Sequence, residues 1–206
     1  MTDRPLDILV LGIGNVLWAD EGFGVRAVET LHEQYEFPES VRLMDGGTQG
    51  LYLVQYVQAA RRLLVFDAVD YGLPPGTIKL VRDDEVPRFM GAKKMSLHQT
   101  GFQEVLAAAA LTGRYPQELL LIGVQPLHLE DYGGSLTPVV KERMPECQHR
   151  ALQQLAEWGV RPAPRTRPLA ADEHLSPHAL DLHAYESGRP GADEACRIGD
   201  ARVLFG

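Results

Sequence analysis

The sequence predicts an α/β fold, a three-layer α/β/α arrangement with a mostly parallel, mixed sheet of about five strands. Short apolar runs without polar alternation, of which residues 8–11 are the first, are typical of strands buried on both faces of a parallel sheet. Stretches with apolar residues at helical spacing separate these runs, as in βαβ units. The strand-like runs end on glycines or acids, and loops beyond the carboxyl ends of such strands form the sites of α/β proteins.

The elements follow one another in regular order. A Pro-Pro-Gly turn precedes the run at residues 77–81, and its quick return indicates an antiparallel edge strand. Thr137 and Pro138 form a good helix start, and Pro145 should kink or split the helix that follows. A polar loop that contains His98 separates the edge strand from the next helix. The predicted strands are residues 8–11, 41–44, 63–66, 77–81 and 119–124, and the predicted helices are residues 24–35, 51–60, 102–113 and 137–158.

The first predicted strand ends in a Gly-x-Gly turn at Gly12 and Gly14. A dinucleotide-binding fingerprint would need a third glycine three residues later, where this chain has Leu17. The fingerprint therefore fails. Each of the two glycines is expected to supply a positive φ in a tight turn.

Charge and composition limit the classes of binding partner and the cell compartment that we expect for this protein. The 206 residues carry a formal net charge of -8, which argues against a nucleic-acid or anionic-membrane surface and favours small molecules or proteins. The N-terminus lacks a secretory signal pattern and no apolar run approaches membrane-spanning length, so a cytoplasmic protein with no membrane insertion is expected. The two cysteines, Cys147 and Cys196, have no metal or redox spacing and are expected to be reduced, unpaired thiols.

Composition changes after Val160. Residues 1–160 are predicted to form the α/β domain, and residues 161–206 a Pro-, Arg- and acid-rich C-terminal tail with the composition of a disordered segment. His174 and His178 are four residues apart, but Pro177 between them disfavours the helix that would align them on a metal. The tail is therefore expected to be solvated and dispensable for activity.

Acidic residues follow the first three predicted strands. Glu21 lies beyond the first, Asp45 ends the second and Asp67 ends the third. If these strands are parallel, the three carboxylates converge on one edge of the sheet, where they must raise one another's pKa or recruit a cation. His98, in a loop that can cover this edge, would add an imidazole. Mixed carboxylate and imidazole ligands suit nickel or zinc better than calcium.

Each of these residues also has a structural interpretation. An aspartate at a strand end often caps the next turn, which applies most strongly to Asp45 before two glycines. Asp20 could take the place of Glu21, and Asp70 the place of Asp67. A single histidine in a loop is most often solvated or hydrogen-bonded. Spacing alone leaves these alternatives open.

Several segments together resemble the hydrogenase maturation proteases. The resemblance covers about residues 7 to 160, and its motifs occur in the family's order and spacing. The motifs are LGIGNVLWADEGFGVRAVE, LMDGGTQG, LLVFDAVD, PPGTIKLVRDDEVP, SLHQTGFQEVL and LIGVQP.

The resemblance implies a cytoplasmic endopeptidase that removes a short C-terminal extension from the large-subunit precursor of a nickel-iron hydrogenase, after nickel insertion. The family's three nickel-binding residues fall on Glu21, Asp67 and His98. In that interpretation the nickel arrives with the substrate and is not held tightly by the free enzyme, which is expected to be a monomer. The sequence shows no nucleophilic serine or cysteine motif, so water would attack, activated by a carboxylate such as Asp45 or Asp67 or directed at a carbonyl polarised by the metal.

Two other functions stay open at this stage. One is a self-contained zinc peptidase or amidase on the same fold, which would hold its own ion. The other is a nickel assembly chaperone that binds a nickel protein without cutting it. The metal content of the purified protein separates the first from the endopeptidase, and a change in precursor mass separates both enzymes from the chaperone.

Overall fold

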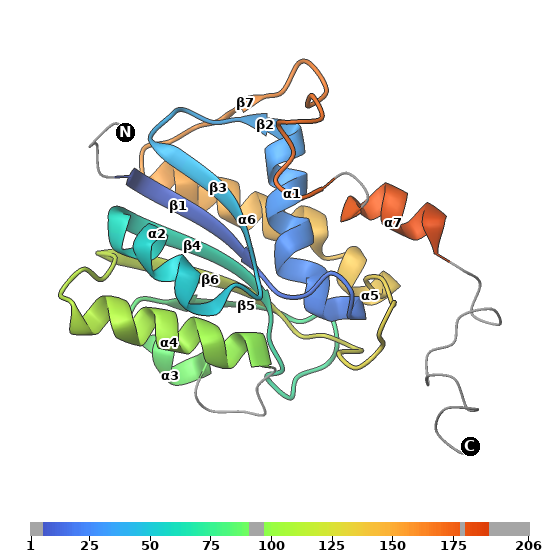
Figure 1. The fold of residues 1–206 in the computed structure, drawn as a ribbon, viewed down its shortest axis with the longest axis horizontal. Coiled ribbons are helices and arrows are strands. Elements are labelled where there is room, and N and C mark those ends of the chain that lie inside the picture. Colours follow the sequence, from blue (N-terminus) through green and yellow to red (C-terminus); the bar gives the residue numbers. More distant parts are fainter. Residues whose placement is uncertain (1–5, 91–96, 178–179, 190–206) are drawn as a thin grey trace.

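A five-stranded mixed sheet forms the centre of the molecule, which we describe from a computed structural model covering residues 6–90, 97–177 and 180–189 (Figure 1). The strand order is β3-β1-β4-β6-β5. The first four strands in that order are parallel, and β5 runs antiparallel to β6 at one edge. This confirms the predicted fold class and the antiparallel edge strand. The strands are β1 (Leu6–Ile13), β3 (Val41–Gly47), β4 (Ala60–Ala68), β5 (Ile78–Arg82) and β6 (Glu118–Val124).

Helices cover both faces of this sheet (Figure 1). One face packs against α1 (Phe23–Gln34) and α6 (Met144–Glu157), and the other against α2 (Val54–Ala59), α3 (Glu85–Met90) and α4 (Leu97–Leu111). None of the helices in the described ranges is long and apolar enough to cross a membrane. The remaining elements are η1 (Ala19–Gly22), η2 (Gly50–Leu53), α5 (Pro138–Lys141), α7 (Leu182–Gly188), β2 (Tyr35–Glu36) and β7 (Ala163–Pro164).

Strand alternation divides the apolar residues between two cores. In β1, Ile8 and Val10 join the core under α1 and α6, whereas Leu9 and Leu11 join the core under α2 and α4. All four side chains are fully buried. A strand buried on both faces explains the continuous apolar run in the sequence.

Close packing of α1 on the sheet depends on two glycines. A Cβ atom on Gly12 would lie 2.3 Å from the carbonyl oxygen of Gly24, and one on Gly24 would lie 2.2 Å from the carbonyl oxygen of Phe66. The expectation of a positive φ is confirmed for Gly14, at 134°, but is wrong for Gly12. Gly12 is required for the approach of the helix, a contact that the turn pattern alone does not reveal.

The last helix is split as predicted, whereas α4 begins earlier than predicted. Pro145 does split the last helix: α5 ends at Lys141 and α6 begins at Met144, with Pro145 in its first turn, where it costs no hydrogen bond. The helix α4 begins at Leu97, so His98 lies in a helix and not in a loop. Its first turn has no apolar periodicity of its own, which is why the sequence pattern placed its start near Phe102.

The tail packs against the domain over residues 161–177 and 180–189. Its strand β7 pairs antiparallel with β2, and the backbone N–H of Arg165 donates to the carbonyl of Gln34 at 2.8 Å. Leu175 packs against the core under α1. The composition of the tail predicted a disordered segment, but the described tail residues are packed. Backbone pairing and side-chain hydrogen bonds hold them in place, although they lack apolar periodicity. The domain boundary at residue 160 stays a prediction, and His178 and Cys196 lie outside the described residues.

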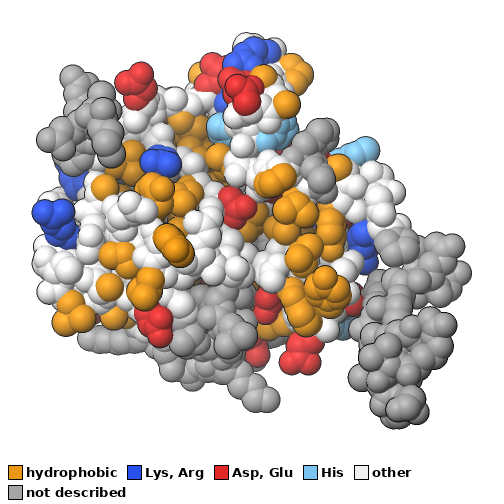
Figure 2. All heavy atoms as spheres, in the orientation of Figure 1, with side chains coloured by type: hydrophobic (Ala, Val, Ile, Leu, Met, Phe, Trp, Pro, Cys, Tyr) orange, Lys and Arg blue, Asp and Glu red, His pale blue; other side chains and the backbone are white. Residues whose placement is uncertain are grey.

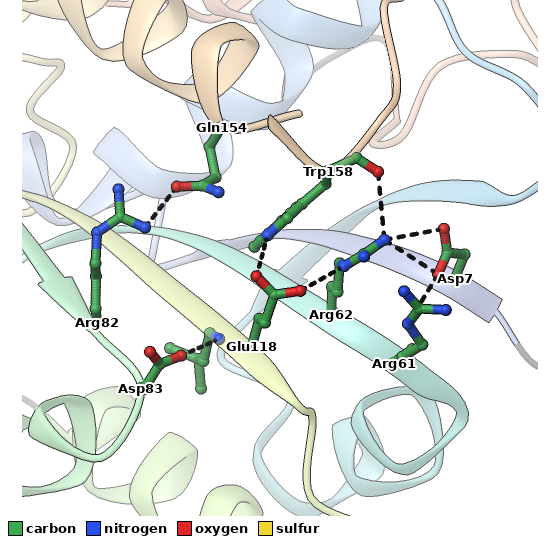
Figure 3. Close-up of polar contacts among 9 residues, drawn as sticks. Asp7, Arg61, Arg62, Arg82, Asp83, Glu118, Gln154 and Trp158 are labelled. Atoms are coloured by element: carbon green, nitrogen blue, oxygen red, sulfur yellow. Dashed lines mark hydrogen bonds and ion pairs between the residues drawn. The ribbon is translucent and has the colours of Figure 1, made fainter. Parts of the chain in front are cut away.

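Ion pairs join neighbouring strands at their amino ends (Figure 3). Arg62 on β4 contacts Glu118 on β6 at 2.8 Å and Asp7 on β1 at 3.4 Å. The indole N–H of Trp158 donates to Glu118 at 2.9 Å. The hydrogen bond from Arg62 first, and then the one from Trp158, hold the pKa of the Glu118 carboxyl below its usual range. The charged groups at the amino ends of the strands therefore join neighbouring strands to one another.

Candidate active site

The carboxyl ends of the parallel strands bring Glu21 and Asp67 to one edge of the sheet. Glu21 lies in η1 and is partly exposed, and its carbonyl oxygen accepts a hydrogen bond from the N–H of Asn15 at 3.2 Å. A Cβ atom on Gly14 would lie 1.8 Å from that oxygen, so the turn after β1 packs directly against the backbone of Glu21. Asp67 is the second-last residue of β4 and is fully buried.

Asp67 projects from the face that α4 covers. Its neighbours Val65 and Val69 belong to the core under α2 and α4, and side chains at alternate positions share a face. A Cβ atom on Gly101, in α4, would lie 3.5 Å from the Cα of Gly50, the first residue of η2, which follows β3. The beginning of α4, where His98 stands, is therefore placed at the same edge and the same face as Asp67. The His98 side chain lies outside the described part of the structure.

Asp45 projects from the opposite face. It pairs in register with Gly12, which faces α1, and its carboxylate accepts a hydrogen bond from the Ser176 hydroxyl at 2.8 Å. Burial raises the pKa of Asp45, and it also raises that of Glu29 on α1, although nearby Arg26 opposes both shifts. The structure does not bring Asp45 together with Asp67. Its suggested role as general base stays a prediction.

Asp20 has a structural role. Its buried carboxylate accepts four hydrogen bonds: from the N–H groups of Leu127, His128 and Thr137, at 2.9, 3.0 and 2.7 Å, and from the Thr137 hydroxyl at 3.0 Å. Thr137 does occupy the predicted N-cap position, but its hydroxyl contacts Asp20 instead of its own helix. Asp20 thus fixes the loop after β6, and this argues against its replacing Glu21 in a metal site.

Asp70 borders an open cavity next to the candidate site. The cavity measures about 450 Å³ and is lined by Asp70 and residues 125–131. One Asp70 oxygen accepts hydrogen bonds from the N–H of Gly72 at 2.9 Å and from the side chain of Gln125 at 3.0 Å. These contacts hold Asp70 in the loop beyond Asp67, and they give it a different environment from that of the buried Asp67.

Tyr71 and Gln125 belong to this edge and were missed by the sequence interpretation. The Gln125 side-chain oxygen accepts hydrogen bonds from the N–H groups of Tyr71 at 2.7 Å and Leu73 at 3.2 Å. Burial, and then the charge of Asp67, raise the pKa of the Tyr71 hydroxyl. The available signal was a glutamine directly after an apolar strand, in the motif LIGVQP.

A metal site cannot be assembled from described side chains alone. Within the described ranges, which leave out the side chain of His98, no three His, Cys, Asp or Glu residues are grouped so that they could hold an ion. Glu21 and Asp67 supply oxygen ligands at the correct edge. The joint site of Glu21, Asp67 and His98 therefore stays a prediction. The backbone positions of these three residues are consistent with such a site.

Comparisons with known proteins agree with this architecture. The family model for hydrogenase maturation proteases matches residues 25–154. A hydrogenase expression/formation protein of Thiocapsa roseopersicina is 64% identical over 198 residues, which cover 96% of this chain and 90% of that protein. The hydrogenase 2 maturation protease of Escherichia coli is 42% identical over 159 residues, covering 77% of this chain and 96% of that protein. The solved structure of the hydrogenase-maturating endopeptidase HybD of E. coli has 40% identity and a TM-score of 0.74, and covers 78% of this chain and 98% of that one.

Together, the α/β fold and these comparisons define the protein as a hydrolase of the endopeptidase class. The chain belongs to the hydrogenase maturation protease family, as its motifs predicted. The match to the T. roseopersicina protein extends into the tail, because it covers 96% of this chain, whereas the match to the E. coli protease leaves about a quarter of the chain uncovered. The tail is thus a shared feature of one set of relatives.

Proposed function

We propose that this endopeptidase removes the C-terminal extension from the large-subunit precursor of a nickel-iron hydrogenase, after nickel has been inserted. Membership of the family supports the reaction. The observation that carries the choice of site is that Asp67 and the first turn of α4 share one face of the sheet, at the edge where Glu21 lies. The protein would act in the cytoplasm as a monomer.

Nickel would be recognised by Glu21, Asp67 and His98 while the precursor still holds it. Two carboxylates and one imidazole, without a thiolate, make a site of moderate strength that leaves coordination positions for the precursor's own ligands. Hydrolysis would use water, because burial raises the pKa of the Cys147 thiol to about 12 and leaves it without thiolate character at neutral pH. Cys196 lies outside the described residues.

A folded protein substrate fits the surface around the site. Large apolar side chains are exposed on the segments that follow β3 and β6: Leu51 and Tyr52 in η2, and Leu127 and Tyr132 beyond β6. The ring of Tyr132 stands edge-on to Trp18, 5.3 Å between centroids, next to η1. Figure 2 shows hydrophobic patches between charged groups on one face of the molecule. Exposed aromatic and aliphatic clusters of this kind are typical of protein–protein contacts.

The first test is the mass of a nickel-loaded large-subunit precursor before and after incubation with the protein. We expect the wild type to remove the extension, and Asp67→Asn and His98→Ala to leave the precursor uncut while keeping the thermal unfolding midpoint of the wild type. His149→Ala, which changes an exposed histidine on α6, should cleave normally. Normal cleavage by both site variants would refute the assignment.

The same experiment separates the two alternative functions. A self-contained zinc peptidase or amidase would be purified with tightly bound zinc and would cut a nickel-free precursor, whereas the proposed endopeptidase carries little metal and ignores that precursor. A nickel assembly chaperone would bind the loaded precursor and leave its mass unchanged.

A further inference from the structure

The loop after β6, residues 125–137, contacts both η1 and the tail. Toward η1, Tyr132 forms an isolated β-bridge with Trp18. The N–H of Gly133 donates to the carbonyl of Leu17 at 2.7 Å. These contacts join the loop to the segment that leads into η1 and its two acids.

The contact of this loop with the tail is made by α7, which lies beside α5 (Figure 1). One oxygen of the Glu186 carboxylate accepts a hydrogen bond from the Ser135 hydroxyl at 2.7 Å and lies 2.6 Å from the Lys141 ammonium. The other oxygen accepts from Lys141 at 2.9 Å. The Tyr185 hydroxyl donates to the carbonyl of Gly134 at 3.4 Å. The helix α7 therefore joins two successive residues of the loop to α5, which begins where the loop ends.

The helix α7 is itself anchored on the domain. Its N-cap is Asp181, whose side chain accepts a hydrogen bond from the N–H of Ala184 at 2.7 Å. Arg26 on α1 is only 2% exposed, and it donates to the carbonyl of Leu180 just before α7. The Arg26 guanidinium also lies over the Tyr185 ring, 5.6 Å from its centroid. A helix this short is marginal alone, so these contacts hold it in place.

The loop depends on such contacts for its own shape. Residues 125–137 form no helix or strand apart from the bridge at Tyr132. They nevertheless border the open cavity next to the candidate site, and they expose Leu127 and Tyr132 at 48% and 55%. A partner binds a surface less tightly, in proportion to the fraction of time that the surface spends in another shape. Contacts that fix the loop therefore strengthen any binding to it.

We propose that Glu186 is a positioning residue for substrate binding: through Ser135 and Lys141 it holds the loop after β6 in the shape that the large-subunit precursor binds. The inference rests on the proposed function. The composition of the tail predicted that it is dispensable for activity, whereas these contacts give residues 182–188 a part in substrate binding. Because Glu186 acts on a docking surface and not on the reacting groups, its effect belongs to KM and not to kcat.

The test reverses the charges of the Lys141–Glu186 pair, singly and together. Glu186→Lys sets two ammonium groups against each other, and Lys141→Glu sets two carboxylates, so each should release α7 from the loop. The double variant restores opposite charges, and its ammonium group can still donate to the Ser135 hydroxyl oxygen. We expect each single variant to raise KM for the nickel-loaded precursor by roughly 3- to 10-fold with kcat unchanged. The double variant should return KM to within about twofold of the wild type.

Hydrogen exchange gives a second readout that does not depend on catalysis. In the single variants the amides of residues 127–137 should exchange faster than in the wild type, while those of β1 and β4 keep their rates, because the opening is local. The matched control is Glu173→Lys, which makes the same change of charge in the same tail. The Glu173 carboxylate contacts Arg167 and the N–H of Ala170. This control should keep the wild-type KM and loop exchange.

Three results would overturn the inference. The first is wild-type KM and wild-type loop exchange in both single variants. The second is a double variant as impaired as the single ones, since the ion pair would not be the cause. The third is a loss confined to kcat, which would mean that the loop positions reacting groups instead of the precursor. If Glu186→Lys does not fold, Glu186→Gln tests the same pair, because it removes the charge and keeps an acceptor for Ser135.

Failure of this inference can be told from failure of the proposed function. If the wild type cuts the loaded precursor and both single variants match its KM, the function stands and the inference fails. If the wild type leaves the precursor uncut, the proposed function fails and takes with it the role in substrate binding. Hydrogen exchange would then still report whether α7 holds the loop.

Discussion

At the scale of single residues, Asp20 and Glu21 are neighbours in the chain with opposite environments. Asp20 is fully buried and receives four hydrogen bonds from the loop after β6, whereas Glu21 is partly exposed at the edge of the sheet. Both lie in the short turn η1, where successive side chains point in different directions. One acid therefore holds the site together, and the other is available to the substrate.

Exchanging each acid for its amide should separate these roles. Asp20→Asn turns one acceptor into a donor that faces buried N–H groups, so we expect it to lower the free energy of unfolding by about 2–4 kcal/mol, roughly 5–15 °C in the unfolding midpoint. Glu21→Gln should leave the midpoint unchanged and abolish processing of the nickel-loaded precursor. Calorimetry and precursor mass measure the two effects. A stable Asp20→Asn variant without processing activity would contradict a purely structural role for Asp20.

At the scale of elements, the tail is held to α1 and β2 chiefly by polar contacts. The Arg165 side chain donates to the carbonyls of His32 at 3.2 Å and Tyr35 at 3.1 Å, and it is 10% exposed. Further along, the backbone carbonyl of Leu180 accepts a hydrogen bond from Arg26 on α1, and Ser176 reaches Asp45. The tail thus covers charged groups of α1 that the domain alone would leave to solvent.

Two tail arginines provide a matched pair for testing this packing. Arg165→Ala leaves two partly buried carbonyls without a donor, so we expect a loss of about 1–3 kcal/mol in the free energy of unfolding, roughly 3–10 °C in the midpoint. Arg167→Ala removes an ion pair with Glu173 whose two side chains are largely open to solvent, and it should leave the midpoint almost unchanged. Equal midpoints for the two variants, measured by calorimetry, would show that the tail is not part of the stable fold.

At the scale of the whole molecule, buried acids determine part of the response to pH. Folding raises the pKa of Glu29 and Asp45, mainly through burial, so the folded state binds these protons more tightly than the unfolded chain does. Their contribution to stability is fully present below the unfolded pKa, about 4, and is lost as the pH rises through the raised folded pKa. At neutral pH the two carboxylates therefore cost stability.

Replacing Asp45 with asparagine should remove part of this cost. The amide oxygen can still accept from Ser176, and the buried charge is gone. We expect Asp45→Asn to unfold at a higher temperature than the wild type at pH 7 to 8, with the difference shrinking as the pH falls toward about 4. Thermal unfolding across this pH range measures it. A lower midpoint at neutral pH would mean that attraction to Arg26 outweighs burial, and lost processing in a folded Asp45→Asn protein would assign Asp45 a role in hydrolysis.

The sequence by itself determined the layers of the fold, the antiparallel edge strand, the split helix at Pro145 and membership of the family. These features depend on local signals: apolar runs for strands buried on both faces, the fixed φ and missing N–H of proline, and motifs in a set order. It also placed Glu21 and Asp67 at one edge, because the carboxyl ends of parallel strands must meet there.

Only the tertiary structure decided which face of the sheet each acid occupies. Asp45 and Asp67 both end strands, yet Asp45 faces α1 and Asp67 faces α4, because side chains alternate along a strand and the pairing register sets which alternate is buried where. Tyr71 fills the space over Gly123 through a contact 52 residues away in the chain, and the tail is ordered by hydrogen bonds to α1 and β2. Such contacts join distant segments, and no local pattern of residue types encodes them.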